Sequence, residues 1–170
     1  MDNLVQPFVI IRPSGMPFAS EILQFLMTYG IKLKDGILIR DWIAVASVLY
    51  FDKFGDNETG HLQPGAQAWL QSTAILFGER ALVYQLRLED ETNNDQILRS
   101  LTLAKKAKLE FRLSRQKMKE KISISTYHLG VQYPVFFDYI HSPDPDLLRL
   151  RQEWIWVNNH GKLDYSERCP

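Results

Sequence analysis

The sequence predicts an α+β protein of the ferredoxin-like sandwich type, with a four-stranded antiparallel sheet covered by helices. Two observations support this fold class. Short β-branched apolar runs alternate with segments of helical apolar spacing, and the strand–helix–strand order of the first half has a weak echo in the second. The chain has 170 residues, which is enough for one domain with a substantial core, and 45% of them are apolar.

Residues that end strands or cap and end helices define the elements in the first half of the chain. Pro13 ends the first apolar run, Ser20 is a candidate N-cap for the next helix, and Gly30 is a candidate terminator. Asp35 and Gly36 interrupt the following alternating run, which predicts a strand with a bulge or a hairpin-like irregularity. The predicted elements are strands at 4–12 and 31–42, helices at 17–30, 42–54 and 65–77, and a polar loop at 55–65.

Alternation and helical spacing also define the second half. Leu82, Tyr84 and Leu86 recur at every second position, as the buried face of a strand requires. Asp144 and Asp146 suit the positive N-terminal end of the last helix. The predicted elements are strands at 80–90 and 133–141 and helices at 93–121 and 144–157.

These elements predict one domain, residues 1–157, followed by a polar C-terminal tail, residues 158–170. The one cysteine, Cys169, is consistent with a reducing compartment. Residues 1–15 lack the basic start of a signal peptide, and no apolar run approaches the roughly 20 residues of a membrane span. We therefore expect a cytoplasmic protein with no membrane contact.

The charge distribution restricts the possible partners. With 20 basic and 20 acidic residues the net charge is zero, so no global field attracts nucleic acid or an anionic membrane. The segment 105–121 is locally basic and is either a phosphate-binding wall, a docking surface for an acidic protein, or a solvated helix face. Its single aromatic, Phe111, argues against a stacking platform for single-stranded nucleic acid. The basic residues are Lys105, Lys106, Lys108, Arg112, Arg115, Lys117, Lys119 and Lys121.

Established catalytic motifs are absent from the sequence. It contains no Walker A, GxGxxG, HExxH or GxSxG pattern. The four histidines, at positions 61, 128, 141 and 160, are not spaced as the histidine pairs of helical metal sites are. We therefore expect no metal bound by the protein alone.

His141 is the candidate with chemistry, because it ends an apolar strand just before a helix N-terminus. Such an N-terminus suits an anion, and a neutral imidazole beside it is placed to attack a phosphoryl group. The alternative is a structural ring that hydrogen-bonds a backbone carbonyl and closes a corner. On the helix that follows, Arg149 and Glu153 are expected to form an ordinary surface ion pair.

A series of motifs in fixed order accompanies this histidine, and together they resemble a divergent nucleoside diphosphate kinase over about residues 6–157. No single motif is specific, so the order and spacing carry the resemblance. The motifs are IIRPSG at 10–15, SEILQFLMTYGIKL at 20–33, Tyr50 in a helix, PGAQAWLQSTA at 64–74, YQLRLED at 84–90, and DYIHSPDP at 138–145 with Trp156 beyond it.

The resemblance implies a ping-pong phosphotransferase. His141 would take a phosphoryl group from a nucleoside triphosphate such as ATP, with Mg²⁺ carried by the nucleotide, and pass it to an acceptor. Asp144 and Gln152 would support the histidine, Gln152 in the place of a glutamate that orients the ring. It also implies a homo-oligomer. The residues implied to contact the nucleotide or its phosphates are Arg12, Tyr50, Lys53, Leu62, His128 and Asp138.

Several departures from the kinase pattern open a second hypothesis. Asp138 stands in place of an asparagine, Pro143 in place of a serine, and the nucleotide-clamping loop is replaced by the basic segment. The alternative is therefore a catalytically impaired protein of the same fold, acting as a nucleotide-sensing or protein-interaction module.

Overall fold

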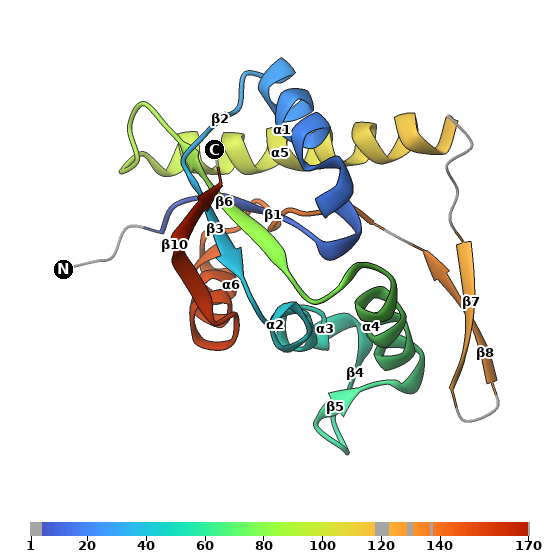
Figure 1. Ribbon diagram of the computed structural model, residues 1–170. Coiled ribbons are helices and arrows are strands. Elements are labelled where there is room, and N and C mark those ends of the chain that lie inside the picture. The colour runs from blue at the N-terminus through green and yellow to red at the C-terminus, as the bar shows by residue number, and fades with distance from the viewer. Residues whose placement is uncertain (1–4, 118–122, 129–130, 137, 170) are drawn as a thin grey trace.

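The computed structural model describes residues 5–117, 123–128, 131–136 and 138–169, and within them a central antiparallel sheet organises the chain (Figure 1). All the strand pairs that form it are antiparallel, and the strand order is β10-β3-β6-β1-β9, with the short β2 also paired to β6. The protein is therefore α+β. The strands are β1 (Phe8–Ile11), β2 (Lys32–Leu33), β3 (Gly36–Ile39), β6 (Ala81–Arg87), β9 (Ile140–His141) and β10 (Leu163–Cys169).

β1 is the strand on which the two cores of the protein are built. Its apolar residues are buried on both faces, with Phe8 and Ile10 in one core and Val9 and Ile11 in the other. This explains why the segment is apolar at consecutive positions and does not alternate with polar residues. The register with β9 places Ile10 opposite His141, so the central strand fixes the position of that histidine.

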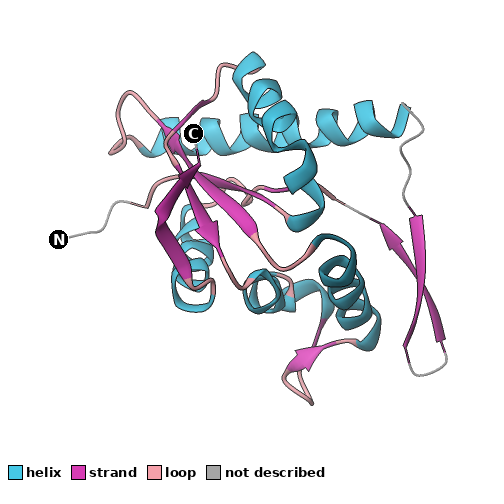
Figure 2. Cartoon of the chain, viewed as in Figure 1, coloured by secondary structure: helices cyan, strands magenta, loops and turns pink. Residues whose placement is uncertain are grey.

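Helices cover both faces of the sheet (Figures 1 and 2). α1 and most of α5 lie on one face, while α2, α4 and α6 lie on the other. α5 contributes to both cores, because Leu101 packs in one and Phe111 in the other. The helices are α1 (Ala19–Thr28), α2 (Trp42–Leu49), α3 (Phe51–Phe54), α4 (Pro64–Phe77), α5 (Asn94–Lys117) and α6 (Leu147–His160), with a 3-10 helix, η1 (Pro13–Phe18), after β1.

The corner after β1 is tied to the segment that precedes β9. The backbone N–H of Arg12 donates to the Tyr139 carbonyl at 3.0 Å, and the Ser14 hydroxyl donates to the Asp138 carbonyl at 2.7 Å. A side chain at Gly15 would clash with the same Tyr139 carbonyl, so only glycine permits this approach. These contacts hold Arg12 and Asp138 beside His141.

Most predicted elements are present, and Gly30 ends α1 with a positive φ of 75° as expected. The helix at 93–121 is seen as one uninterrupted element, α5, up to Lys117. Ser20 does not cap α1, since that helix begins at Ala19 after η1. Asp41 and Asp146 cap α2 and α6 by accepting from the backbone N–H groups of Ala44 and Arg149, and Asn93 caps α5 by accepting from that of Gln96.

The polar tail predicted for residues 158–170 is instead the end of α6 followed by β10. The Gly161 carbonyl accepts from the backbone N–H groups of Arg40 and Asp41, at 3.0 and 3.1 Å, and starts the pairing of β10 with β3. Arg40 also forms an ion pair with Asp164. A strand at the edge of a sheet needs no continuous apolar pattern, which is why its composition resembles that of a tail.

The strand predicted at 133–141 is divided. β8 (Val131–Phe136) pairs with β7 (Ser123–His128) in a hairpin beside α4, and β9 alone joins the central sheet. The predicted polar loop at 55–65 contains a two-residue ladder between β4 (Gly55–Asp56) and β5 (His61–Leu62). None of the helices that the structure describes is both long and apolar enough to cross a membrane.

The packing of α5 makes a stability prediction. Leu101→Ala removes a fully buried side chain from the core, and we expect a loss of about 2–5 kcal/mol in the free energy of unfolding. Leu113→Ala, on the same helix but 50% exposed, is the matched control and should change it by less than about 1 kcal/mol. Urea denaturation measures both, and equal effects would contradict the described orientation of α5.

Candidate functional site

A cavity of about 970 Å³ lies beside His141, at the end of the sheet where the corner after β1 meets α5 and α6. Ten charged side chains, six basic and four acidic, line it together with His141. The basic residues are Arg12, Lys53, Lys105, Lys108, Arg112 and Arg149, and the acidic residues are Asp52, Asp138, Asp144 and Glu153.

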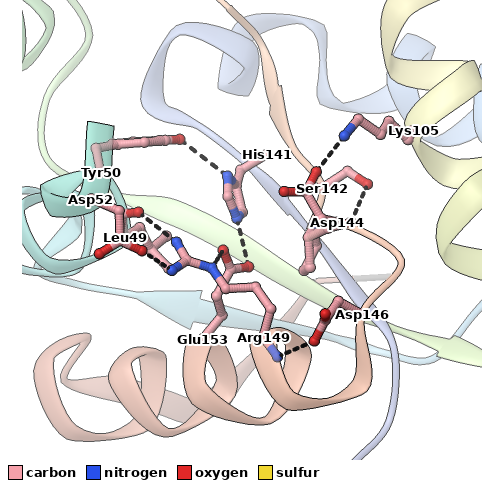
Figure 3. A network of polar contacts seen from close by, with 11 residues as sticks. Leu49, Tyr50, Asp52, Lys105, His141, Ser142, Asp144, Asp146, Arg149 and Glu153 are labelled. Atoms are coloured by element: carbon pink, nitrogen blue, oxygen red, sulfur yellow. Dashed lines mark hydrogen bonds and ion pairs between the residues drawn. The ribbon is translucent and has the colours of Figure 1, made fainter. Parts of the chain in front are cut away.

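His141 is held through both ring nitrogens (Figure 3). Nε2 lies 3.1 Å from Oε2 of Glu153, and Nδ1 lies 3.1 Å from the hydroxyl oxygen of Tyr50. A carboxylate only accepts hydrogen bonds, so the neutral ring carries its proton on Nε2 and donates it to Glu153. Nδ1 then carries no proton, and its lone pair accepts from the Tyr50 hydroxyl.

Arg149 holds Glu153 in place. Its Nε donates to Oε1 of Glu153 at 3.0 Å, and its remaining nitrogens reach Asp52 and the Leu49 carbonyl, the latter at 2.9 Å. The guanidinium also lies 5.0 Å from the centre of the Trp156 ring. The predicted surface pair is therefore part of a chain of contacts that ends on His141.

Burial and the charged or hydrogen-bonding partners together set the pKa values of His141, Glu153 and Tyr50. Burial lowers the pKa of His141, and the Glu153 carboxylate opposes that effect without reversing it. Burial alone would raise the pKa of Glu153, but His141 and Arg149 hold it below its usual range. Burial also raises the pKa of Tyr50. At neutral pH the group is therefore a neutral imidazole between a carboxylate and a phenol.

Arg12 is a buried cation beside this group. Only 6% of the residue is exposed, and its guanidinium carbon lies 5.1 Å from the centre of the Tyr50 ring and 5.7 Å from that of Trp69. Its Nε is buried and has no hydrogen-bond partner among the residues that the structure describes. A buried donor without a partner is costly, and the residue that carries this one lines the cavity.

Three basic residues of α5 form the opposite wall, and we refer to Lys105, Lys108 and Arg112 as the α5 basic face. Lys108 lies 3.3 Å from the Asp138 carboxylate, Arg112 lies 4.0 Å from it, and Lys105 pairs with Asp144. The spacing of these three residues puts them on one side of the helix. This part of the basic segment is therefore the wall of a cavity and not only a solvated face.

The ion pairs of this wall shift the pKa values of its members. Burial alone would raise the pKa of Asp138, but Arg12, Lys108 and Arg112 keep it below its usual range. Burial lowers the pKa of Lys108, against the attraction of Asp138. The hydrogen bond from Lys105 lowers the pKa of Asp144. Asp138 and Asp144 are therefore ionised at neutral pH.

Six of the predicted site residues meet at this cavity, namely Arg12, Tyr50, Lys53, Asp138, His141 and Asp144.

Two of the remaining three predicted residues, Leu62 and Gln152, do not join them. Leu62 is buried in the apolar core and lines a different cavity, so it offers no surface for a base beside His141. Gln152 is exposed, and its neighbour Glu153 contacts the histidine instead. Adjacent helical residues point about 100° apart, so only one of the two can face the ring. The side chain of His128, in β7, lies outside the described part of the chain.

Sequence reasoning also missed several residues of the site. Arg149 and Glu153 carried a signal, their spacing of four residues, but spacing does not show which face of a helix is buried. Trp69 of α4 lies in the cavity wall, and its position follows only from the packing of that helix. No group of three or more metal-ligating side chains occurs among the described residues.

Comparisons with known proteins give one partial match. The chain is 26% identical over 125 residues to the human (Homo sapiens) prolyl 4-hydroxylase subunit alpha-3. The alignment covers 69% of this chain, which spans only 22% of the length of that subunit. No family model and no solved structure matches the chain.

These comparisons contradict the resemblance to nucleoside diphosphate kinases. The relative that they identify belongs to a different family, and no family model supports the kinase assignment. The short motifs that suggested it are each weakly specific, and their order does not establish descent. Function is therefore inferred from the geometry of the cavity alone.

The contact between His141 and Glu153 makes a titration prediction. Glu153→Gln keeps an oxygen that can accept from Nε2 but removes the negative charge, so the pKa of His141 should fall further. NMR titration of the imidazole measures this change. Glu58→Gln, at an exposed position outside the cavity, should leave the pKa unchanged. An unchanged or raised pKa in Glu153→Gln would show that the carboxylate does not stabilise the charged ring.

Proposed function

We propose that this protein is a phosphotransferase that moves a phosphoryl group from a nucleoside triphosphate to an acceptor through His141. The observation that carries the proposal is the fixed ring of His141 in the cavity wall, with Nε2 bound to Glu153 and Nδ1 left with its lone pair. A neutral imidazole with its second nitrogen engaged by a carboxylate is an activated nucleophile. The surrounding cations suit the charge of a phosphate ester.

The chemistry divides into two displacements at phosphorus. Nδ1 of His141 forms a bond to the γ-phosphorus while the bond to the bridging oxygen breaks, and the nucleoside diphosphate leaves with the electron pair. The acceptor then attacks the phosphohistidine, and the electrons of the P–N bond return to Nδ1. The Tyr50 hydroxyl must leave Nδ1 before the first step, and Glu153 stabilises the charged ring that forms.

Arg12 and Lys108 supply the electrostatic part of the proposal. Both are cations in the cavity wall, and Arg12 has a buried Nε with no partner among the described residues. A phosphate oxygen satisfies such a donor, and an arginine fork suits its geometry. Mg²⁺ belongs to the substrate, because it bridges the phosphate oxygens of the nucleotide.

The same proposal includes a ferredoxin-like topology. Without the added strand β10, the order β3-β6-β1-β9 is that of four antiparallel strands in which the first and third lie at the centre. We further propose a cytoplasmic location, which agrees with the single cysteine at position 169. A homo-oligomer stays a prediction.

A binding module is the second candidate, and one observation favours it. In the described arrangement Tyr50 occupies Nδ1 and Asp138 neutralises part of the basic wall, so the cavity holds its own partners. Such a protein would bind a nucleotide without transferring its phosphate.

Two further functions have less support. Docking of an acidic protein along 105–121 is not favoured, since Lys108 and Arg112 face the cavity and Arg115 is buried against Phe18 and Phe111. Lys119 and Lys121 of that segment lie outside the described residues. Prolyl hydroxylation is not proposed either, because the chain spans 22% of the hydroxylase subunit.

Incubation with Mg²⁺ and γ-labelled ATP tests the transfer. We expect an acid-labile, base-stable label on the protein that is lost in His141→Gln, because a phosphohistidine has this stability. His61→Gln and His160→Gln, at exposed positions outside the cavity, are the matched controls and should keep the label.

The outcome separates the two candidates. Absence of label with every nucleoside triphosphate overturns the transferase. Calorimetric binding of the same nucleotides would then support the binding module.

A further inference from the structure

Asp138 is a carboxylate in the wall of a cavity that six basic side chains also line. Its Oδ2 lies 3.3 Å from Nζ of Lys108 and 4.0 Å from Arg112, and its side chain is only 20% exposed. The Ser14 hydroxyl donates to the backbone carbonyl of Asp138, and this contact fixes the position from which the carboxylate projects. One oxygen atom therefore faces two cations of the α5 basic face.

The cations around Asp138 are not fully satisfied by it. The Nε atoms of Arg12 and Arg112 are both buried and have no hydrogen-bond partner within the described residues. Arg12 is buried and lines the cavity. Three cations thus share one carboxylate and leave two donors open. A group with more acceptor oxygens than a carboxylate would match them better.

We propose that Asp138 is a resident counter-ion whose carboxylate stands where a phosphoryl group of a condensed phosphate binds, and that the ligand takes its place among Arg12, Lys108 and Arg112. The ligand class is a triphosphate chain, free or as part of a nucleotide, and this identity rests on the proposed function. Asp138 also sets the affinity. Its negative charge stabilises the empty site and repels the incoming phosphate.

Removing the charge of Asp138 tests the inference without any transfer reaction. We expect Asp138→Asn to bind sodium tripolyphosphate at least about tenfold more tightly at low salt, with a steeper loss of affinity as salt rises. Isothermal titration calorimetry measures both quantities. Asp95→Asn removes the same charge from the first turn of α5, outside the cavity, and should leave the affinity unchanged.

Thermal melting covers the case in which Asp138→Asn weakens the fold. The substitution leaves three cations without their counter-ion, so the melting temperature should fall without ligand and rise more with tripolyphosphate than it does in the unaltered protein. Lys108→Gln should lower tripolyphosphate affinity in either background. Lys106→Gln, exposed on the same helix and outside the cavity, is its control.

The possible results separate this inference from the proposed function. Unchanged or weaker tripolyphosphate binding by a folded Asp138→Asn overturns the inference, as does an unchanged affinity in Lys108→Gln. Tighter tripolyphosphate binding by Asp138→Asn together with no labelling of His141 supports the proposed role of Asp138 as a counter-ion and overturns the transferase. Labelling of His141 together with an unchanged tripolyphosphate affinity in Asp138→Asn supports the transferase and overturns the counter-ion.

Discussion

The buried carboxylate of Glu153 is the constraint around which the site is organised. A carboxylate that is 4% exposed at its side chain is unstable unless cations or donors surround it. His141 supplies one donor from the end of β9 and Arg149 supplies another from one helical turn before. The same arginine ties α6 to Asp52 and to the end of α2. Satisfying one charge therefore fixes the relative position of a strand and three helices.

A second set of charges lies across the cavity, and its members are less completely paired. Asp138 neutralises part of a cationic wall, but open donors remain on Arg12 and Arg112. The first set immobilises a ring, and the second leaves capacity for an anion. The two sides of the cavity therefore differ: His141 is fixed by fully paired partners on one side, and incompletely paired cations lie on the other.

Local patterns predicted the elements whose neighbours impose a periodicity. β6 and α4 were predictable from alternation and helical spacing, and Gly30 from its role at a helix end. β10 was not predictable as a strand, because at a sheet edge its polar residues resemble those of a tail. β7 was also missed. In the described part of the chain it pairs with the adjacent β8 in a separate two-stranded sheet and does not belong to the central sheet. Similarity of short motifs misled in the other direction and suggested a family that the comparisons contradict.

The sequence by itself determined that His141 ends a strand before a capped helix, and that a cluster of basic residues lies on one helix. Those properties depend on neighbours along the chain. Only the tertiary structure decided that Glu153, and not Gln152, faces the ring, and that Lys108 and Arg112 line the cavity beside it. Helix rotation and the burial of Arg12 depend on packing between segments more than a hundred residues apart. The same packing removes water from around these charges and so strengthens the interactions between them.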